Sequence, residues 1–164
     1  RPLARLERKP IQEADAVVDC GWARVLIFGM GRIGEGAYDE IVAERGGGVV
    51  GIDRDPETVD AQRQAGRSVV RGDALDLDFW ERFKFHPEVE LVFAAMNSQE
   101  ANLECARRVR TFLPKAHIAA IARYHDQIEG LQQAGVDVAR NLYEEAGQAL
   151  AADAVAEVYS SDDT

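Results

Sequence analysis

The chain has 164 residues, of which 46% are hydrophobic and 29% are charged, and its formal net charge is −10. This length and composition fit one globular domain that closes its own core without disulfides or a structural metal. The acidity argues against nucleic acid and anionic lipid as partners, because both are bound through basic clusters.

The cysteines do not point to a metal or a disulfide. Cys20 and Cys105 are far apart and form no C-x-x-C pair, and no His/Cys/Asp cluster has metal-ligand spacing. Cys105 falls on an apolar helical stripe, which favours a buried, reduced thiol in a cytoplasmic protein. No stretch reaches the roughly 20 apolar residues of a membrane span, so direct membrane insertion is not expected. A start at Arg1 rather than Met leaves open a longer parent chain.

Strand patterns recur along the chain at short intervals. Residues 1–22 are interpreted as a lead-in segment or linker, 23–155 as the domain, and 156–164 as an acidic tail. Short apolar runs bounded by turn residues predict strands at 24–28, 49–53, 68–71, 89–95, 117–122 and 136–138. Helical spacing of apolar residues follows each run. This alternation predicts an α/β fold, a Rossmann-like doubly wound parallel sheet of about six strands with helices on both faces.

The last predicted helix places Leu142, Ala146, Ala149 and Leu150 in helical register. Its apolar face has two interpretations. The face forms a surface for dimerisation, or it packs on the sheet of its own domain.

A G-x-G-x-x-G turn follows the first strand and opens the first helix, as Gly29-Met30-Gly31-Arg32-Ile33-Gly34. Gly29 allows the tight turn, Gly31 lets a pyrophosphate approach the backbone, and Gly34 lets the helix pack close to the strand. The helix N-terminus adds N–H donors and a partial positive charge for a phosphate. The pattern therefore predicts a dinucleotide site. Its alternative is a glycine turn whose site no longer holds a ligand.

An acidic residue ends the second strand, as a ribose site requires. Asp53 lies 19 residues beyond Gly34, close to the spacing of about 20 found in dinucleotide-binding domains. A carboxylate there accepts hydrogen bonds from free ribose hydroxyls and repels a 2′-phosphate, so NAD(H) or another adenine nucleotide is predicted over NADP(H). Arg54 would weaken this preference by turning toward the ribose, and we expect it to face solvent.

The third strand is followed by Gly72-Asp73-Ala74. In a Rossmann sheet this turn lies beside the adenine, so Asp73 is a candidate contact to the adenosine. Asp73 is equally suited to be the N-cap of a helix over Leu75–Phe83, and the two roles can coexist.

Besides the first strand and its glycine turn, Val25–Gly34, several further segments contribute to a family resemblance. They are Gly51–Pro56, Gly72–Ala74, Ala94–Asn97, Asn102, Ile121–Asp126 and Leu131–Val136. In combination they resemble the regulatory nucleotide-binding domains of potassium transporters and channels, called TrkA-N, KTN or RCK domains. The resemblance runs from Ala23 to Leu150. It is nearest to the C-terminal domains of Kef-type, glutathione-gated potassium efflux systems and related cation:proton antiporters.

The resemblance implies a cytoplasmic homodimer at the inner face of the cell membrane that binds NAD(H) or AMP and biases a membrane-embedded cation transporter between closed and open states. The implied nucleotide contacts are the glycine turn, Asp53, Arg54, Gly72, Asp73, Ala74, Ala95, Met96 and Asn97. Arg32 and Arg123 are implied to bind glutathione-type effectors, because a guanidinium pairs with a carboxylate through two hydrogen bonds. Alternatively, Arg32 faces solvent and Arg123 forms an ion pair with Asp126.

A small NAD-dependent oxidoreductase is the alternative function. Hydride transfer needs a proton donor or acceptor in a substrate pocket. His125 is the best candidate, because ligands of open α/β sheets gather at the carboxyl ends of strands. No Tyr-x-x-x-Lys pair occurs and the chain has no room for a substrate domain. A binding module without catalytic residues is therefore the favoured interpretation.

Overall fold

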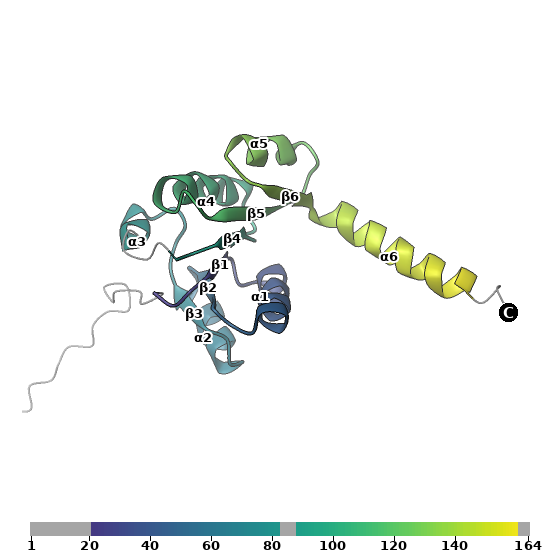
Figure 1. Ribbon diagram of the computed structural model, residues 1–164, viewed down its shortest axis with the longest axis horizontal. Coiled ribbons are helices and arrows are strands. Elements are labelled where there is room, and N and C mark those ends of the chain that lie inside the picture. Colours follow the sequence, from purple (N-terminus) through teal and green to yellow (C-terminus); the bar gives the residue numbers. More distant parts are fainter. Residues whose placement is uncertain (1–20, 83–87, 161–164) are drawn as a thin grey trace, which may run out of the picture.

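In the part of the chain that the structure describes, six parallel strands form one sheet in the order β3-β2-β1-β4-β5-β6 (Figure 1). The computed structural model describes residues 21–82 and 88–160. The strands are β1 (Val25–Phe28), β2 (Val49–Asp53), β3 (Val69–Arg71), β4 (Leu91–Ala94), β5 (His117–Ala122) and β6 (Val138–Asn141). This is the doubly wound order of Rossmann folds, and the predicted fold class is confirmed.

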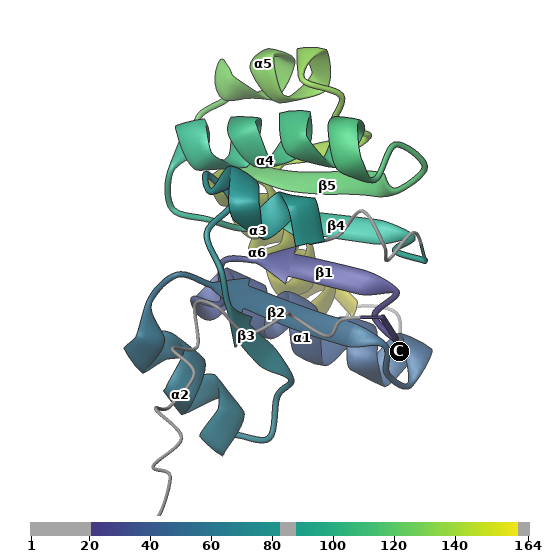
Figure 2. The same cartoon turned by 90° about the vertical axis from the view of Figure 1, so that its left-hand side faces the viewer.

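Helices cover both faces of the sheet (Figure 2). They are α1 (Arg32–Arg45), α2 (Pro56–Gln64), α3 (Leu77–Glu81), α4 (Gln99–Phe112), α5 (Gln127–Gln133) and α6 (Leu142–Tyr159). Tyr38 of α1 and Val59 of α2 share one buried cluster with β1 and β2. Trp80 of α3, Cys105 of α4 and Leu131 of α5 belong to a second cluster on the opposite face.

The two apolar clusters hold the sheet between its helices. On the α4 face, the Trp80 ring stacks on Phe28 at a centroid distance of 5.0 Å, and Phe79 meets Phe28 edge-on at 5.9 Å. Each large apolar side chain that is fully buried contributes roughly 1.5–3 kcal/mol. Phe28, at the end of β1, is therefore held by two aromatic side chains of α3.

The last strand begins two residues later than the predicted 136–138. Gly135 has a φ of +98° and ends α5, and the N–H of Val136 then donates to the Leu131 carbonyl. The Asp137 carboxylate accepts from the N–H of Ile118 at 2.8 Å. Pairing with β5 starts only at Val138. The prediction was wrong here because the apolar Val136 closes a helix instead of entering the ladder.

Helix α6 projects away from the body of the domain (Figure 1), and none of its residues is buried. Asn141 begins it by accepting hydrogen bonds from the N–H groups of Tyr143 and Glu144. The interpretation in which this helix packs on its own sheet is therefore wrong. The helix also runs past residue 155 into the segment interpreted as a tail. Most of the lead-in segment and residues 161–164 lie outside the described residues.

Within the described ranges, no helix combines the length and apolar character needed to cross a membrane. In the same ranges, no group of three or more His, Cys, Asp or Glu side chains is placed to hold a metal ion. Cys105 is a free thiol, completely buried on α4.

Candidate functional site

A cleft lies at the carboxyl ends of the strands, where β1 and β4 are neighbours. The chain leaves these two strands toward opposite faces of the sheet, which is where open α/β folds bind ligands. The cleft measures about 440 Å³, within the usual range for small-molecule sites. Its lining includes the predicted residues Gly29, Gly31, Asp53, Arg54, Gly72, Asp73, Ala74, Ala95, Met96 and Asn97.

The glycine turn closes one side of the cleft. Gly29 has a φ of +91°, and a Cβ atom there would lie 2.8 Å from the Ala95 carbonyl oxygen. At Gly34 a Cβ would lie 1.7 Å from the carbonyl oxygen of Gly29, so α1 packs directly on the turn. A Cβ at Gly31 would meet no atom within 4 Å. Gly31 is also the N-cap of α1 and provides no side-chain cap, so the first N–H groups of α1 are open to an anion.

Asp53 joins the glycine turn to the second strand. One carboxylate oxygen accepts from the N–H of Met30 at 2.8 Å, and the other accepts from the N–H of Asp55 at 2.9 Å. A carboxylate oxygen has two lone pairs, so each oxygen keeps capacity to accept a further hydrogen bond, and Asp53 lines the cleft. Asp55 begins α2, and the Thr58 hydroxyl holds the pKa of the Asp55 carboxyl below its usual range.

The turn after β3 forms another part of the cleft lining. Asp73 accepts from the N–H of Leu75 at 2.9 Å, which closes a tight turn. The N-cap of α3 is Asp76, whose carboxylate accepts from the N–H of Asp78 at 3.0 Å. The alternative in which Asp73 is the helix N-cap was therefore wrong, because the helix begins at Leu77 and Asp76 caps it. A Cβ at Gly72 would lie 2.4 Å from the Phe79 ring, so glycine is required there.

The turn after β4 is held by Asn102, which is 2% exposed. The Asn102 amide accepts from the N–H of Met96 and donates to the Met96 carbonyl, both at 3.1 Å, and it also donates to the Ile121 carbonyl at 3.4 Å. Next to this turn, Arg123 donates from Nη2 to the Asn97 side chain at 2.9 Å. The predicted effector residue Arg123 is thus linked to a residue that lines the cleft.

The other residues of the predicted nucleotide and effector set lie outside the cleft lining. The Met30 side chain is fully buried, and Arg32 is exposed at the start of α1. Further lining residues were not predicted, namely Phe28, Ile52, Asp55, Thr58, Leu75, Ser98 and Ala101. Most of them end a strand or begin a helix at the carboxyl edge of the sheet. This position is the feature of the sequence from which they could have been predicted.

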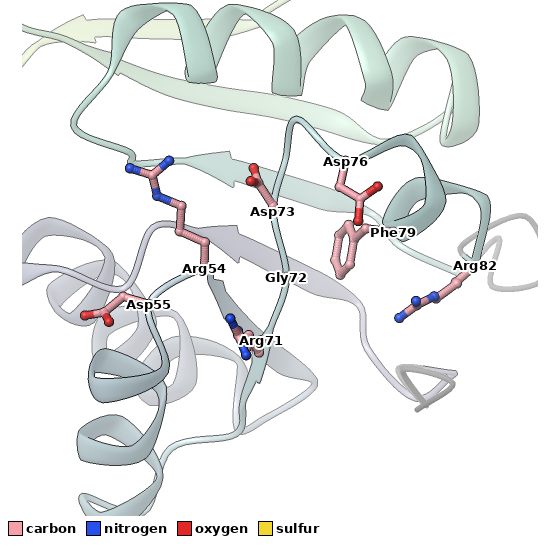
Figure 3. Close-up of a pocket in the computed structure, with 8 residues that line it drawn as sticks. All are labelled: Arg54, Asp55, Arg71, Gly72, Asp73, Asp76, Phe79 and Arg82. Carbon is pink, nitrogen blue, oxygen red and sulfur yellow. The ribbon is translucent and has the colours of Figure 1, made fainter. Parts of the chain in front are cut away.

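A second hollow of about 530 Å³ adjoins the cleft on the β3 side. It shares Arg54, Asp55, Gly72 and Asp73 with the cleft. In Figure 3 the Arg54 guanidinium and the Asp73 carboxylate lie at the same end of the second hollow. Arg54 is exposed, as expected, yet it lines both hollows. A cationic side chain therefore lines the cleft next to Asp53.

His125, the candidate proton donor of the alternative function, does not line the cleft. Its side chain is 82% exposed, and Nδ1 lies 3.4 Å from a carboxylate oxygen of Glu144 on α6. This position links the turn after β5 to the start of α6. It gives no direct support for proton transfer to a ligand in the cleft.

The sheet order, the glycine turn and the acidic end of β2 together define a Rossmann-type α/β domain. A family model for the TrkA-N domain matches residues 25–142, and the chain belongs to the TrkA-N domain family. The resemblance inferred from the sequence is confirmed. Over 136 residues the chain is 34% identical to the glutathione-regulated potassium-efflux system protein KefC of Cronobacter sakazakii. The match covers 82% of this chain and 22% of that protein, so the chain spans about a fifth of its relative.

Solved structures share the fold. The C-terminal domain of Kef from Shewanella denitrificans in its AMP-bound form has a TM-score of 0.66 at 21% identity, over 82% of this chain and 80% of that one. The GsuK channel bound to NAD has a TM-score of 0.61 at 21% identity, over 71% of this chain and 21% of that one. At this identity the likeness establishes the fold.

Proposed function

We propose that the chain is a regulatory domain that binds NAD(H) or AMP in its cleft and gates a potassium efflux system or cation:proton antiporter from the cytoplasmic side of the membrane. The main observation behind this proposal is that Gly31 and Asp53 line the same cleft. Gly31 leaves space for a phosphate at the start of α1, and Asp53 offers acceptors for ribose hydroxyls. Similarity to KefC, to an AMP-bound Kef domain and to an NAD-bound channel supports the proposal.

The nucleotide acts as a signal in this proposal and undergoes no reaction. A ligand shifts an equilibrium between two domain arrangements only by the difference in its affinity for them. The measurable requirement is that AMP, NAD or NADH binds differently to the closed and open transporter. Sustained turnover of NADH with carbonyl substrates would instead support the oxidoreductase.

Calorimetry with AMP, NAD, NADH and NADP tests the binding step. We expect Asp53→Ala to weaken the free-ribose nucleotides about tenfold or more, because a charged acceptor is removed. It should also reduce the discrimination against NADP. Asp60→Ala is the matched control, since Asp60 is an exposed carboxylate on α2. If no nucleotide binds better than millimolar to the folded wild type, the proposal fails.

Glutathione-type effectors form a separate part of the proposal, with Arg32 and Arg123 as their contacts. The Arg123–Asn97 hydrogen bond supports it, because it places the guanidinium beside the nucleotide cleft. Arg123→Ala should weaken binding of a glutathione adduct about tenfold, whereas Arg107→Ala on the exposed side of α4 should not. Equal affinities in all three proteins would remove Arg123 from the effector site.

We also propose that the domain is a homodimer formed through α6. The helix exposes Tyr143, Leu150 and Val158 at 63%, 71% and 61%, which leaves an apolar surface that none of the residues described by the structure covers. Native mass spectrometry should give a dimer for the wild type and a monomer for Leu150→Asp. A stable wild-type monomer at micromolar concentration would contradict this part of the proposal.

A further inference from the structure

Gln62 of α2 is a buried amide close to the glycine turn. It is 7% exposed. Its Nε2 donates to the Met30 carbonyl and to a Glu35 carboxylate oxygen, both at 3.0 Å, and its Oε1 accepts from Arg67 at 2.9 Å. The two N–H donors and the oxygen of the amide therefore all have partners. A buried amide satisfied in this way has one defined orientation.

Arg67 fixes that orientation. Its guanidinium binds the Asp39 carboxylate at 2.7 and 2.8 Å and also approaches Glu35 at 3.4 Å. The Arg67 side chain is 17% exposed, so these pairs are partly shielded from water. Because Arg67 can only donate, it must face the oxygen of the Gln62 amide. The nitrogen of the amide is then turned toward Met30.

Contacts fix three parts of Met30, namely its N–H, its carbonyl and its side chain. Its N–H donates to Asp53 and its carbonyl accepts from Gln62. Its side chain fills the space beside Gly51, where a Cβ would lie 2.5 Å from the Met30 sulfur. In a planar trans peptide the carbonyl and the following N–H point in opposite directions. The hydrogen bond from Gln62 holds the Met30 carbonyl toward the interior. The N–H of Gly31 therefore points the opposite way, toward the cleft that Gly31 lines.

We propose that Gln62 is a positioning residue for the phosphate group of the nucleotide. It acts through the Met30–Gly31 peptide, which it locks with the Gly31 N–H presented to the cleft. Arg67 and Glu35 hold the Gln62 amide in the required orientation. The inference rests on the proposed function, since it presupposes a phosphate at the start of α1.

Comparison of AMP with adenosine isolates this role, because adenosine lacks the phosphate. In Gln62→Met the volume is kept and the donor to Met30 is lost. We expect the affinity for AMP to fall about five- to tenfold, the effect of one buried hydrogen bond, and the affinity for adenosine to change less than about twofold. Gln64→Met is the matched control, an exposed glutamine on the same helix, and should leave both affinities unchanged.

Equal losses for AMP and adenosine, or an unchanged AMP affinity in the folded variant, would overturn the positioning role. Should Gln62→Met fail to fold, Glu35→Ala replaces it. This variant removes the carboxylate that holds the Gln62 amide, and it also removes a negative charge, so electrostatic repulsion would not explain a weaker binding of AMP. It should show the same AMP-selective loss. Failure of the wild type to bind AMP at all would overturn the proposed function itself, so the two failures are distinguishable.

Discussion

The glycine turn and helix α6 are both in contact with solvent, but they are constrained in different ways. The turn is fixed by contacts within the domain, since Gly34 packs on the Gly29 carbonyl and the Asp53 carboxylate, from the end of β2, accepts from the N–H of Met30. Helix α6 is fixed to the domain at its first turn by Asn141 and then extends without burying a residue. The turn is therefore specified by the domain itself, whereas only the start of α6 is held by contacts with the domain.

Helix α4 makes the contrast sharper. It buries Asn102, Cys105, Ala106 and Val109 along one side. The spacing of these residues therefore determines which side of the helix packs on the sheet. Along α6 small and apolar residues occur on all sides, and no side is chosen by the domain. Substitutions should therefore have large effects in the glycine turn and α4 and small effects on the folding of α6.

The largest effect is expected at Gly34. Gly34→Ala places a Cβ 1.7 Å from the Gly29 carbonyl oxygen, so α1 must move off the turn. We expect a loss of about 4 kcal/mol or more, a large part of a typical domain's stability. Urea denaturation followed by circular dichroism measures it. Gly31→Ala is the control, because its Cβ meets open space, and it should change stability by less than about 0.5 kcal/mol. Similar losses in both variants would contradict the packing argument.

The next effect compares α4 with α6 directly. Val109→Asp buries an unpaired carboxylate in the core and should cost about 3–4 kcal/mol, because Val109 is completely buried. Leu150→Asp should change the unfolding free energy of the dilute protein by less than about 0.5 kcal/mol. Urea titrations at low protein concentration test both. A large destabilisation by Leu150→Asp under these conditions would show that α6 contributes to the fold of its own domain.

A smaller effect is expected at Asn102. Asn102→Leu leaves the N–H and carbonyl of Met96 without their amide partner, and the cost should be about 2 kcal/mol. Asn97→Ala provides the comparison, because Asn97 is exposed, and its cost should stay below about 0.5 kcal/mol. Thermal unfolding of the two variants in parallel gives the difference. Equal melting temperatures would mean that the turn after β4 is held by other contacts.

The smallest effect concerns pH. The N–H of Ile118 and the Arg110 guanidinium hold the pKa of the Asp137 carboxyl below its usual range, although burial opposes them. The lowered pKa stabilises the fold at pH values above the ordinary pKa, about 3.9, and this contribution is lost as the pH falls through the lowered value. It should amount to less than about 1 kcal/mol, because the side chain is solvent-screened.

Asp137→Asn tests this pH dependence. Its stability should fall less steeply with acidification below about pH 4 than that of the wild type. Parallel slopes for the two proteins would exclude Asp137 as a contributor to acid unfolding.

Local sequence predicted the strands and the glycine turn because each depends on neighbouring residues. Apolar runs marked buried strands, and Gly29, Gly31 and Gly34 marked the turn. Prediction failed where the same residue type suits two structures. Val136 closes a helix instead of starting β6, and Asp76 caps α3 in place of Asp73.

Long-range polar contacts could not be predicted from the sequence. Gln62 looks like a solvent-facing residue of an amphipathic helix, and it is buried because Arg67 and Met30 meet it in space. Arg123, after β5, meets Asn97, after the neighbouring strand β4, for the same reason. Such contacts depend on how α2 and the turn after β5 dock, which the spacing of residues along the chain does not encode.

The buried thiol on α4 gives the domain a built-in reporter of its own unfolding. Burial raises the pKa of the Cys105 thiol well above its usual range, and the thiolate is the form that reacts with alkylating reagents. Labelling of Cys105 therefore requires the core between α4 and the sheet to open. In a Cys20→Ser background, the labelling rate would follow the population of open molecules. Under the proposed function, a nucleotide that stabilises the domain would slow that labelling, which gives a readout of ligand binding that needs no transport assay.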